Sequence, residues 1–357
     1  MHQFMIRNHD SSLLPLSLPP IFHTHPAGTG AYHSAVFSNA SDFEGKVVVD
    51  VGTGSGILAF FAARAGARIV YALEASGAAA HARTLLAANG LGDKICVIQA
   101  RVEDTSLPEK ADIIISEPMG FMLIHERMLE SYITARQRFL KPGGRMFPTR
   151  GDIICAPFTD AALHAEQTSK VLFWENTSFF GMDLTALRGA AARDHFGQPV
   201  VGYVDVSTLL ASSMTCATVD FASDLPSSLD TVSAHFDFLI TKTGVCHGLA
   251  AWFDVAFVGT TATVILPTGP SSPGTHWYQC RALLCDPIAV NAGQRLVGTL
   301  LCKANARYSY DMTLSMTVKG SELTTENGLP VISVNTISLA DQQYSYLTTT
   351  NAAAATT

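Results

Sequence analysis

The sequence predicts an α/β fold, with a doubly wound parallel sheet followed by an antiparallel β domain. Three observations predict it. Between residues 46 and 144, short apolar runs alternate with helical patterns, as in open parallel sheets. After Arg150 charged residues become sparse, and β-branched and aromatic residues alternate in short segments. Between about residues 172 and 199 the spacing is helical and phenylalanines are frequent, which predicts an inserted arm.

Composition limits the classes of function. The chain has 357 residues, 48% of them hydrophobic and 15% charged, so it can bury sizeable cores. A net charge of -7 without blocks of like charge argues against a direct nucleic-acid binder and suits a basic protein substrate. No apolar stretch is long enough to predict a membrane span. Seven scattered cysteines without a Cys-x-x-Cys pair predict free thiols and no metal site.

The pattern also suggests domain boundaries. Residues 1–40 are predicted to be mostly irregular, because prolines interrupt the leucines near the start. Residues 41–149 should form the parallel-sheet domain, and residues 150–342 the antiparallel domain with its arm. The low-complexity end, residues 343–357, is predicted to be a disordered tail.

Each element of the first domain follows from its residues. Buried strands are indicated by apolar runs, and helices by an apolar residue every three or four positions. The strands expected are 46–51, 68–73, 95–98 and 113–115, and the helices are 57–65, 78–88 and 125–140.

A glycine-rich turn follows the first strand. Gly52, Gly54 and Gly56 stand at alternate positions, and Glu74 ends the next strand about 20 residues later. Such glycines let the backbone approach a ligand, and the acid can accept ribose hydroxyls. Dinucleotide sites share this arrangement, but Asp50 and the Gly-x-Gly-x-Gly spacing favour S-adenosylmethionine. A turn without a ligand remains the alternative.

A second candidate site follows the fourth strand. Glu117 stands at the carboxyl end of that strand, Pro118 and Gly120 predict a turn, and Glu126 stands near the start of a helix. Two carboxylates on one short loop suit a guanidinium, which is planar and always charged. Alternatively, Glu117 merely ends a strand and Glu126 is a solvated acid in the first turn of a helix.

Four segments in order resemble the type I protein arginine methyltransferases, and among them the coactivator-associated branch. They are the glycine turn with its strand (49–58), the double-glutamate loop (116–131), a dimerisation arm (183–191) and a Thr-His-Trp loop (275–279). The resemblance implies a Rossmann-like S-adenosylmethionine-dependent methyltransferase domain, then an antiparallel β-barrel with an inserted helical dimerisation arm at about 172–199.

The resemblance also implies roles for individual residues. Glu117, Glu126 and His276 would be catalytic, and Met119 and Trp277 would contact substrate. The cofactor would be held by Asp50, Gly52, Gly54, Gly56, Glu74, Val102 and Glu103. Taken without the resemblance, Glu103 is a solvated loop acid and His276 a polar residue of the barrel.

The implied reaction is methyl transfer from S-adenosylmethionine to arginine nitrogens in proteins, leaving S-adenosylhomocysteine and needing no metal. The products would be monomethylarginine and asymmetric dimethylarginine. Substrates would be histones, RNA-binding proteins or transcription-associated proteins, the protein would be a homodimer, and its location would be the nucleus and cytoplasm.

Departures from the family pattern keep a second reading open. Residues 1–40 lack the family's Tyr-Phe-x-x-Tyr motif, and Gly28 stands where the family has an arginine. His25, Thr53 and His125 also differ from the usual family residues. These departures suggest a truncated or divergent start, and the alternative function is that of a catalytically impaired, dimerising scaffold.

Overall fold

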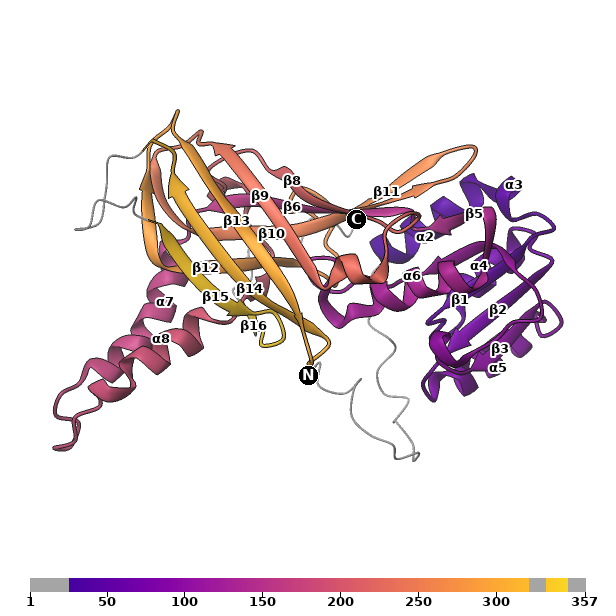
Figure 1. The fold of residues 1–357 in the computed structure, drawn as a ribbon, viewed down its shortest axis with the longest axis horizontal. Coiled ribbons are helices and arrows are strands. Elements are labelled where there is room, and N and C mark those ends of the chain that lie inside the picture. The colour runs from indigo at the N-terminus through magenta and orange to yellow at the C-terminus, as the bar shows by residue number, and fades with distance from the viewer. Residues whose placement is uncertain (1–25, 321–331, 346–357) are drawn as a thin grey trace, which may run out of the picture. The chain divides into compact units, whose positions relative to one another are not determined.

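The computed structural model describes residues 26–320 and 332–345, and the chain divides into two compact units. The first unit contains the described residues up to Ser116, together with Phe139–Arg145 and Gly259–Ala262. The second contains Glu117–Arg138, Met146–Val258 and the described residues from Thr263 onward. Figure 1 labels most elements of both units.

The first unit is built on a five-stranded sheet of order β3-β2-β1-β4-β5. Neighbouring strands from β3 to β4 are parallel, as predicted for a Rossmann-like domain. Every residue of β1 is buried, which explains its unbroken apolar sequence on either side of Asp50. The strands are β1 (Val47–Val51), β2 (Ile69–Glu74), β3 (Ile95–Gln99), β4 (Ala111–Ser116) and β5 (Leu140–Phe147).

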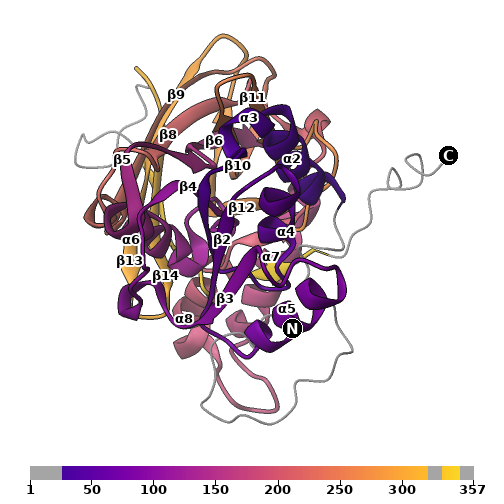
Figure 2. The same cartoon turned by 90° about the vertical axis from the view of Figure 1, so that its right-hand side faces the viewer.

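Helices α4 and α5 pack on this sheet, and α2 packs on α4 (Figure 2). The helices of the unit are α2 (Pro26–Ser38), α3 (Ala40–Phe43), α4 (Ile57–Arg64) and α5 (Ala78–Ala88). The prediction that residues 1–40 are irregular is therefore wrong for 26–38, whereas residues 1–25 lie outside the described residues. Gly28 and Gly30 weaken the helical signal, but Tyr32, Ala35 and Val36 bury one face completely.

The second unit contains two sheets whose strands pair antiparallel, except that β16 pairs with β7 in parallel. One has the order β16-β7-β12-β10-β6-β8, with β11 paired to β10, and the other has the order β15-β14-β13-β9. Strand β8 lies beside β9 and β12 beside β15, so the two sheets enclose a common interior, as the barrel prediction requires (Figure 1). Asn335 of β15 helps to join the sheets, because its Nδ2 donates to the carbonyl of Leu283 in β12 at 2.7 Å.

Strands β9 and β15 show the predicted alternation of buried and exposed residues, whereas β10 is buried along most of its length. The strands of this unit are β6 (Arg150–Phe158), β7 (Val200–Gly202), β8 (Met214–Asp220), β9 (Thr231–Leu239), β10 (Gly244–Val258), β11 (Thr263–Pro267), β12 (Gln279–Val290), β13 (Arg295–Asn305), β14 (Ser309–Val318), β15 (Ser333–Ser338) and β16 (Gln343–Tyr344). Strand β16 pairs with β7, so the predicted tail begins too early; residues 346–357 lie outside the described residues.

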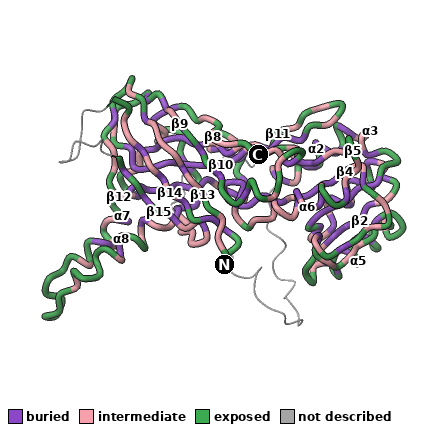
Figure 3. The backbone as a smooth tube through the Cα atoms, in the orientation of Figure 1, coloured by how far each residue is buried: buried purple, intermediate pink, exposed green. Residues whose placement is uncertain are grey.

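Three helices complete the second unit: α6 (Met128–Phe139), α7 (Ala161–Leu172) and α8 (Arg188–Phe196). Helices α7 and α8 form the arm, which extends away from the sheets and is mostly exposed toward its tip (Figure 3). The arm starts earlier than predicted, because the Asp160 side chain caps α7 by accepting from the Leu163 amide at 2.9 Å. Among the described helices, none is both long and apolar enough to cross a membrane.

Candidate active site

In the first unit, the predicted glycine turn connects β1 to α4. Gly52, Gly54 and Gly56 all adopt left-handed backbone angles, with φ values of 70°, 56° and 90°. A side chain at Gly56 would also lie 3.0 Å from Leu86, so this position is restricted sterically as well as conformationally. The amides of Gly52 and Thr53 both donate to the Leu73 carbonyl at 2.9 Å, which ties the turn to β2.

Asp50 is completely buried beneath this turn. Its Oδ2 accepts from the Thr53 hydroxyl and from the Ala59 amide, the latter at 3.0 Å, so one carboxylate joins the strand, the turn and the helix. Its Oδ1 has no hydrogen-bond partner among the described residues. Burial raises the pKa of Asp50 to about 7, and Glu74 nearby contributes in the same direction. The structure thus gives Asp50 a supporting position below the turn.

Glu74 and the segment after β3 lie at the same sheet edge as the turn. Glu74 accepts from the Gly54 amide and the Ser76 amide, both at 2.9 Å, and remains partly exposed. It lies opposite Gln99 in β3, so the 3-10 turn Val102–Asp104 begins close by. Val102 is buried, while Glu103 is half-buried and pairs with Arg101 at 3.4 Å. The structure therefore brings all the predicted cofactor-binding residues to the carboxyl edge of one sheet.

In the second unit, the double-glutamate loop is tightly folded and buried over residues 118–124. Met122, Leu123, Glu126 and Arg127 all have left-handed backbone angles, with φ values of 53°, 75°, 71° and 56°. Such angles are unfavourable for residues with side chains and often mark functional sites. The predicted helix from His125 is therefore wrong at its start, since Glu126 interrupts it and α6 begins only at Met128.

The pKa values of both glutamates of the loop are raised. Desolvation raises the pKa of Glu117 well above its ordinary value, and the charge of Glu126 adds to this rise. The Met119 amide donates to Glu117 and opposes the shift. Glu117 Oε1 is buried and has no hydrogen-bond partner among the described residues. Glu126 is exposed as a whole residue. Protein atoms packed around its carboxyl group nevertheless desolvate that group and raise its pKa.

Trp277 connects this loop to the Thr-His-Trp segment. Its indole Nε1 donates to the Met119 carbonyl at 2.9 Å, and the ring is almost fully buried. His276 packs against Trp277 with ring centroids 3.9 Å apart. The structure thus brings Met119 and Trp277 into contact and places His276 beside them. Their roles in substrate binding and catalysis remain predictions.

Sequence reasoning missed the contacts that hold the loop in place. His125 Nδ1 lies 2.9 Å from Ser309 Oγ in β14, and Arg127 Nη1 donates to the Asn305 carbonyl in β13 at 3.3 Å. Ser309 and Asn305 stand more than 170 positions further along the chain. No local pattern indicates such pairs, although the unusual residue at His125 was a signal.

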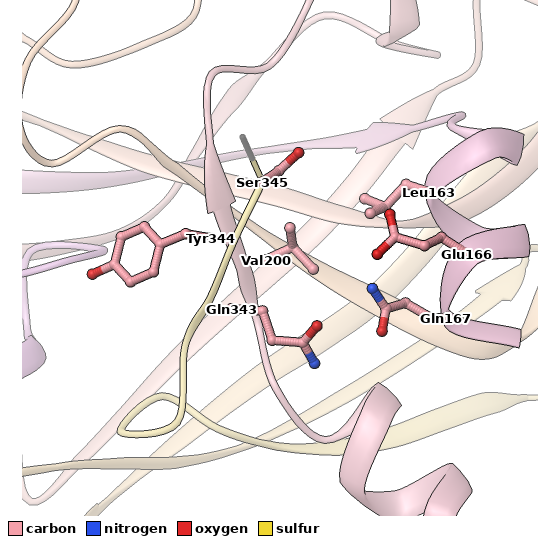
Figure 4. Close-up of a pocket in the computed structure, with 7 residues that line it drawn as sticks. All are labelled: Leu163, Glu166, Gln167, Val200, Gln343, Tyr344 and Ser345. Atoms are coloured by element: carbon pink, nitrogen blue, oxygen red, sulfur yellow. The ribbon is translucent and has the colours of Figure 1, made fainter. Parts of the chain in front are cut away.

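A separate pocket of about 310 Å³ lies at the base of the arm (Figure 4). Glu166 and Gln167 of α7 face it from one side, and Gln343 and Ser345 from the other (Figure 4). No residue predicted to be functional lines this pocket.

Comparisons with known proteins place these sites in context. Residues 150–321 match the family model for the arginine methyltransferase oligomerization subdomain, and residues 48–144 match a methyltransferase domain. The chain is 48% identical over 301 residues to histone-arginine methyltransferase CARMER of Drosophila ananassae, covering 84% of this chain and 56% of that protein. It is 52% identical over 292 residues to the probable histone-arginine methyltransferase CARM1 of Oryza sativa subsp. indica, covering 82% and 55%. The chain thus spans about half the length of these relatives.

Solved structures of protein arginine methyltransferases are similar to this chain over nearly their whole length. The Trypanosoma brucei PRMT1 enzyme-prozyme complex with AdoHcy superposes with a TM-score of 0.80 at 31% identity, covering 89% of this chain and 96% of that one. Arabidopsis thaliana protein arginine methyltransferase 10 gives the same score, identity and coverage.

Proposed function

Because the chain belongs to the protein arginine methyltransferase family, we propose that it transfers methyl groups from S-adenosylmethionine to arginine side chains of proteins such as histones. The observation that carries the proposal is the double-glutamate loop. Two neighbouring carboxyl groups with raised pKa values lie in a strained loop, where one oxygen of Glu117 has no partner among the described residues.

A guanidinium is the ligand that best fits the two carboxyl groups of Glu117 and Glu126. Its positive charge would offset the repulsion between Glu117 and Glu126, and its fork of donors would satisfy buried carboxylate oxygens. Once ionised, the two carboxylates would draw positive charge toward the nitrogens they bond and leave another nitrogen more nucleophilic. Glu126 or His276 would accept the proton late in the transfer.

The glycine turn fits the cofactor. Gly52, Gly54 and Gly56 leave room for close approach of a ligand to the backbone, and the partly exposed carboxylate of Glu74 could accept ribose hydroxyls. Val102 and Glu103 would contact the adenine. Bound S-adenosylmethionine would supply an electrophilic methyl group. The AdoHcy in the Trypanosoma brucei complex supports this assignment for the family.

The finer specificity is part of the same proposal. The resemblance to type I enzymes supports monomethylarginine and asymmetric dimethylarginine as products. The names of the relatives from Drosophila and Oryza support histones as substrates. Histone substrates are consistent with a location in the nucleus as well as the cytoplasm, which fluorescence microscopy of the tagged chain would test.

The test replaces each carboxylate with an amide of the same shape. Glu117→Gln and Glu126→Gln should each lower methyl transfer about 100-fold or more, because an amide cannot provide the charge. Transfer is measured from labelled cofactor to a histone or Gly-Arg-rich peptide, with product identification by mass spectrometry. Glu44→Gln, which changes an exposed acid of the first unit, is the control and should keep full activity.

Cofactor titration separates the possible failures. Both variants should bind S-adenosylmethionine as the unmodified chain does. If the unmodified chain is active and either variant keeps its rate, the double-glutamate mechanism is wrong. If the unmodified chain binds cofactor but transfers no methyl group to any arginine substrate, the scaffold alternative gains support instead.

We also propose that the arm mediates a homodimer. Its tip exposes several large apolar side chains, with Phe180 96% and Met182 66% exposed, and a lone chain would leave this patch in water. Phe180→Asp together with Met182→Asp should shift the protein from dimer to monomer in light scattering at micromolar concentration. A full-length unmodified chain that is already monomeric there would refute the proposal.

A further inference from the structure

The conformation of Glu126 requires support from its neighbours. Its φ of 71° lies in the left-handed region, which costs a residue with a side chain on the order of 1–2 kcal/mol. The two flanking residues, His125 and Arg127, both bond to one hairpin of the second unit, formed by β13 and β14. The contacts on either side thus hold the turn in which Glu126 lies.

His125 makes the more elaborate set of contacts. Its Nδ1 lies 2.9 Å from the hydroxyl of Ser309, a completely buried residue at the start of β14. Its Nε2 lies 3.2 Å from Gln342 Nε2, and its ring stacks on Phe121 with centroids 5.7 Å apart. The ring therefore links its own loop to two segments that lie far away in the sequence.

These partners determine the protonation of the ring. Gln342 Nε2 also donates to the Leu339 carbonyl, which fixes the side-chain amide with its nitrogen toward His125. His125 Nε2 must then accept, so the proton of the neutral ring is on Nδ1 and is donated to Ser309.

The backbone at this position is fixed as well. A Cβ atom placed on Gly120 would lie only 2.1 Å from the His125 carbonyl oxygen, so the chain approaches itself as closely as glycine allows. The side chain and the main chain of His125 are thus both fixed by their contacts. Glu126 is the next residue along the chain, so its position is restricted too.

We propose that His125 is a positioning residue for Glu126. The Nδ1-protonated imidazole ties the turn to Ser309 and Gln342, and this holds the Glu126 carboxyl group close enough to Glu117 for both to bond one guanidinium. The inference rests on the proposed arginine methylation, which it deepens by assigning a role to a residue that does not itself contact the substrate.

The experiment compares two substitutions that remove different parts of this link. His125→Leu removes both polar contacts and should lower kcat about 100-fold, as misplacement of a reacting group by about 1 Å does. His125→Asn can still donate to Ser309 from a similar position, and should stay within about tenfold of the wild-type kcat, since it loses one hydrogen bond. The affinity for S-adenosylmethionine should be unchanged in both. His235→Leu, on the exposed face of β9, is the matched control.

A second readout does not depend on turnover. The pKa values of the Glu126 and Glu117 carboxyl groups are measured by NMR in the wild-type chain and in His125→Leu. Release of the turn should lower the pKa of Glu126 toward that of an ordinary glutamate. The pKa of Glu117 should fall with it, because the charge of Glu126 contributes to its rise. A purely structural histidine would lower the melting temperature without this paired shift.

The outcomes separate the two proposals. Unchanged kcat and unchanged glutamate pKa values in His125→Leu would overturn the positioning role. A wild-type chain that methylates no arginine substrate, but whose glutamate pKa values do fall in His125→Leu, would refute the proposed function and leave the positioning role standing.

Discussion

The glycine turn and the double-glutamate loop both contain residues with left-handed backbone angles, but the residue types differ. In the turn, the residues with left-handed angles are Gly52, Gly54 and Gly56, which adopt them at little cost. In the loop they are Met122, Leu123, Glu126 and Arg127, which adopt them at a cost. The turn is determined by its own residues, whereas the loop depends on Trp277, Ser309 and Asn305 from distant segments.

This difference predicts that the loop is the more fragile of the two. A change in the turn should act locally, since its strain is small and its contacts are mostly backbone hydrogen bonds to β2. A change in the loop should release stored strain and displace both glutamates at once. Four substitutions test this contrast, from the largest expected effect to the smallest.

Gly120→Ala should have the largest effect. Its new methyl group would overlap the His125 carbonyl at 2.1 Å, so the loop must open, at a cost on the order of 4–5 kcal/mol. The melting temperature and methyl transfer should both fall sharply. Gly77→Ala, which meets nothing within 4 Å, is the control and should be nearly neutral. Equal melting temperatures for the two variants would contradict the contrast.

Asp50 gives the turn a pH dependence. Burial raises its folded pKa from 3.8 to about 7, so the folded chain keeps a proton that the unfolded chain loses. This contribution to stability is complete below about pH 4, declines as the pH rises toward 7, and amounts to about 4 kcal/mol at most. Asp50→Asn does not titrate, so its melting temperature should rise relative to wild type between pH 5 and pH 8. A constant difference across that range would exclude the raised pKa.

Glu74→Ala should affect cofactor binding while sparing the fold. Loss of a charge-assisted hydrogen bond to the ribose should weaken S-adenosylmethionine binding by about 1–3 kcal/mol in isothermal titration. The loop in the other unit should be unaffected, so the NMR-measured pKa values of Glu117 and Glu126 should stay as in wild type. Unchanged cofactor affinity would remove Glu74 from the site.

Gly54→Ala should have the smallest effect. A side chain here has open space, with the nearest atom 4.0 Å away, and only its φ of 56° opposes the substitution. The expected loss of stability is on the order of 1 kcal/mol, measured by urea unfolding. A loss as large as that of Gly120→Ala would mean that the turn is as strained as the loop.

The same contrast explains what the sequence could predict. The parallel sheet, the position of the turn and Glu74 follow from local patterns, because glycine spacing and apolar runs are properties of neighbouring residues. Both glutamates are candidates for the same reason, and their catalytic role stays a prediction. The strain at Glu126 and the interruption before Met128 were not predicted, because helical spacing from Met128 extended the expected helix backward and the contact with Ser309 is not local. The helix at 26–38 was missed because its glycines conceal a fully buried face.

The tip of the β10–β11 hairpin limits where the chain can be cut into separately folding fragments. Residues Gly259–Ala262, between β10 and β11, belong to the first unit, where the buried Asn39 accepts from the amides of Thr261 and Ala262 at 3.0 and 2.8 Å. The first unit is thus assembled from three separate stretches of chain. A gene fragment cut after residue 145 would leave the buried Asn39 Oδ1 without these two amide donors, so the methyltransferase-like half is not a portable module for recombination or fusion. Any shuffling of the two halves between relatives must carry this four-residue tip along with α2 and α3.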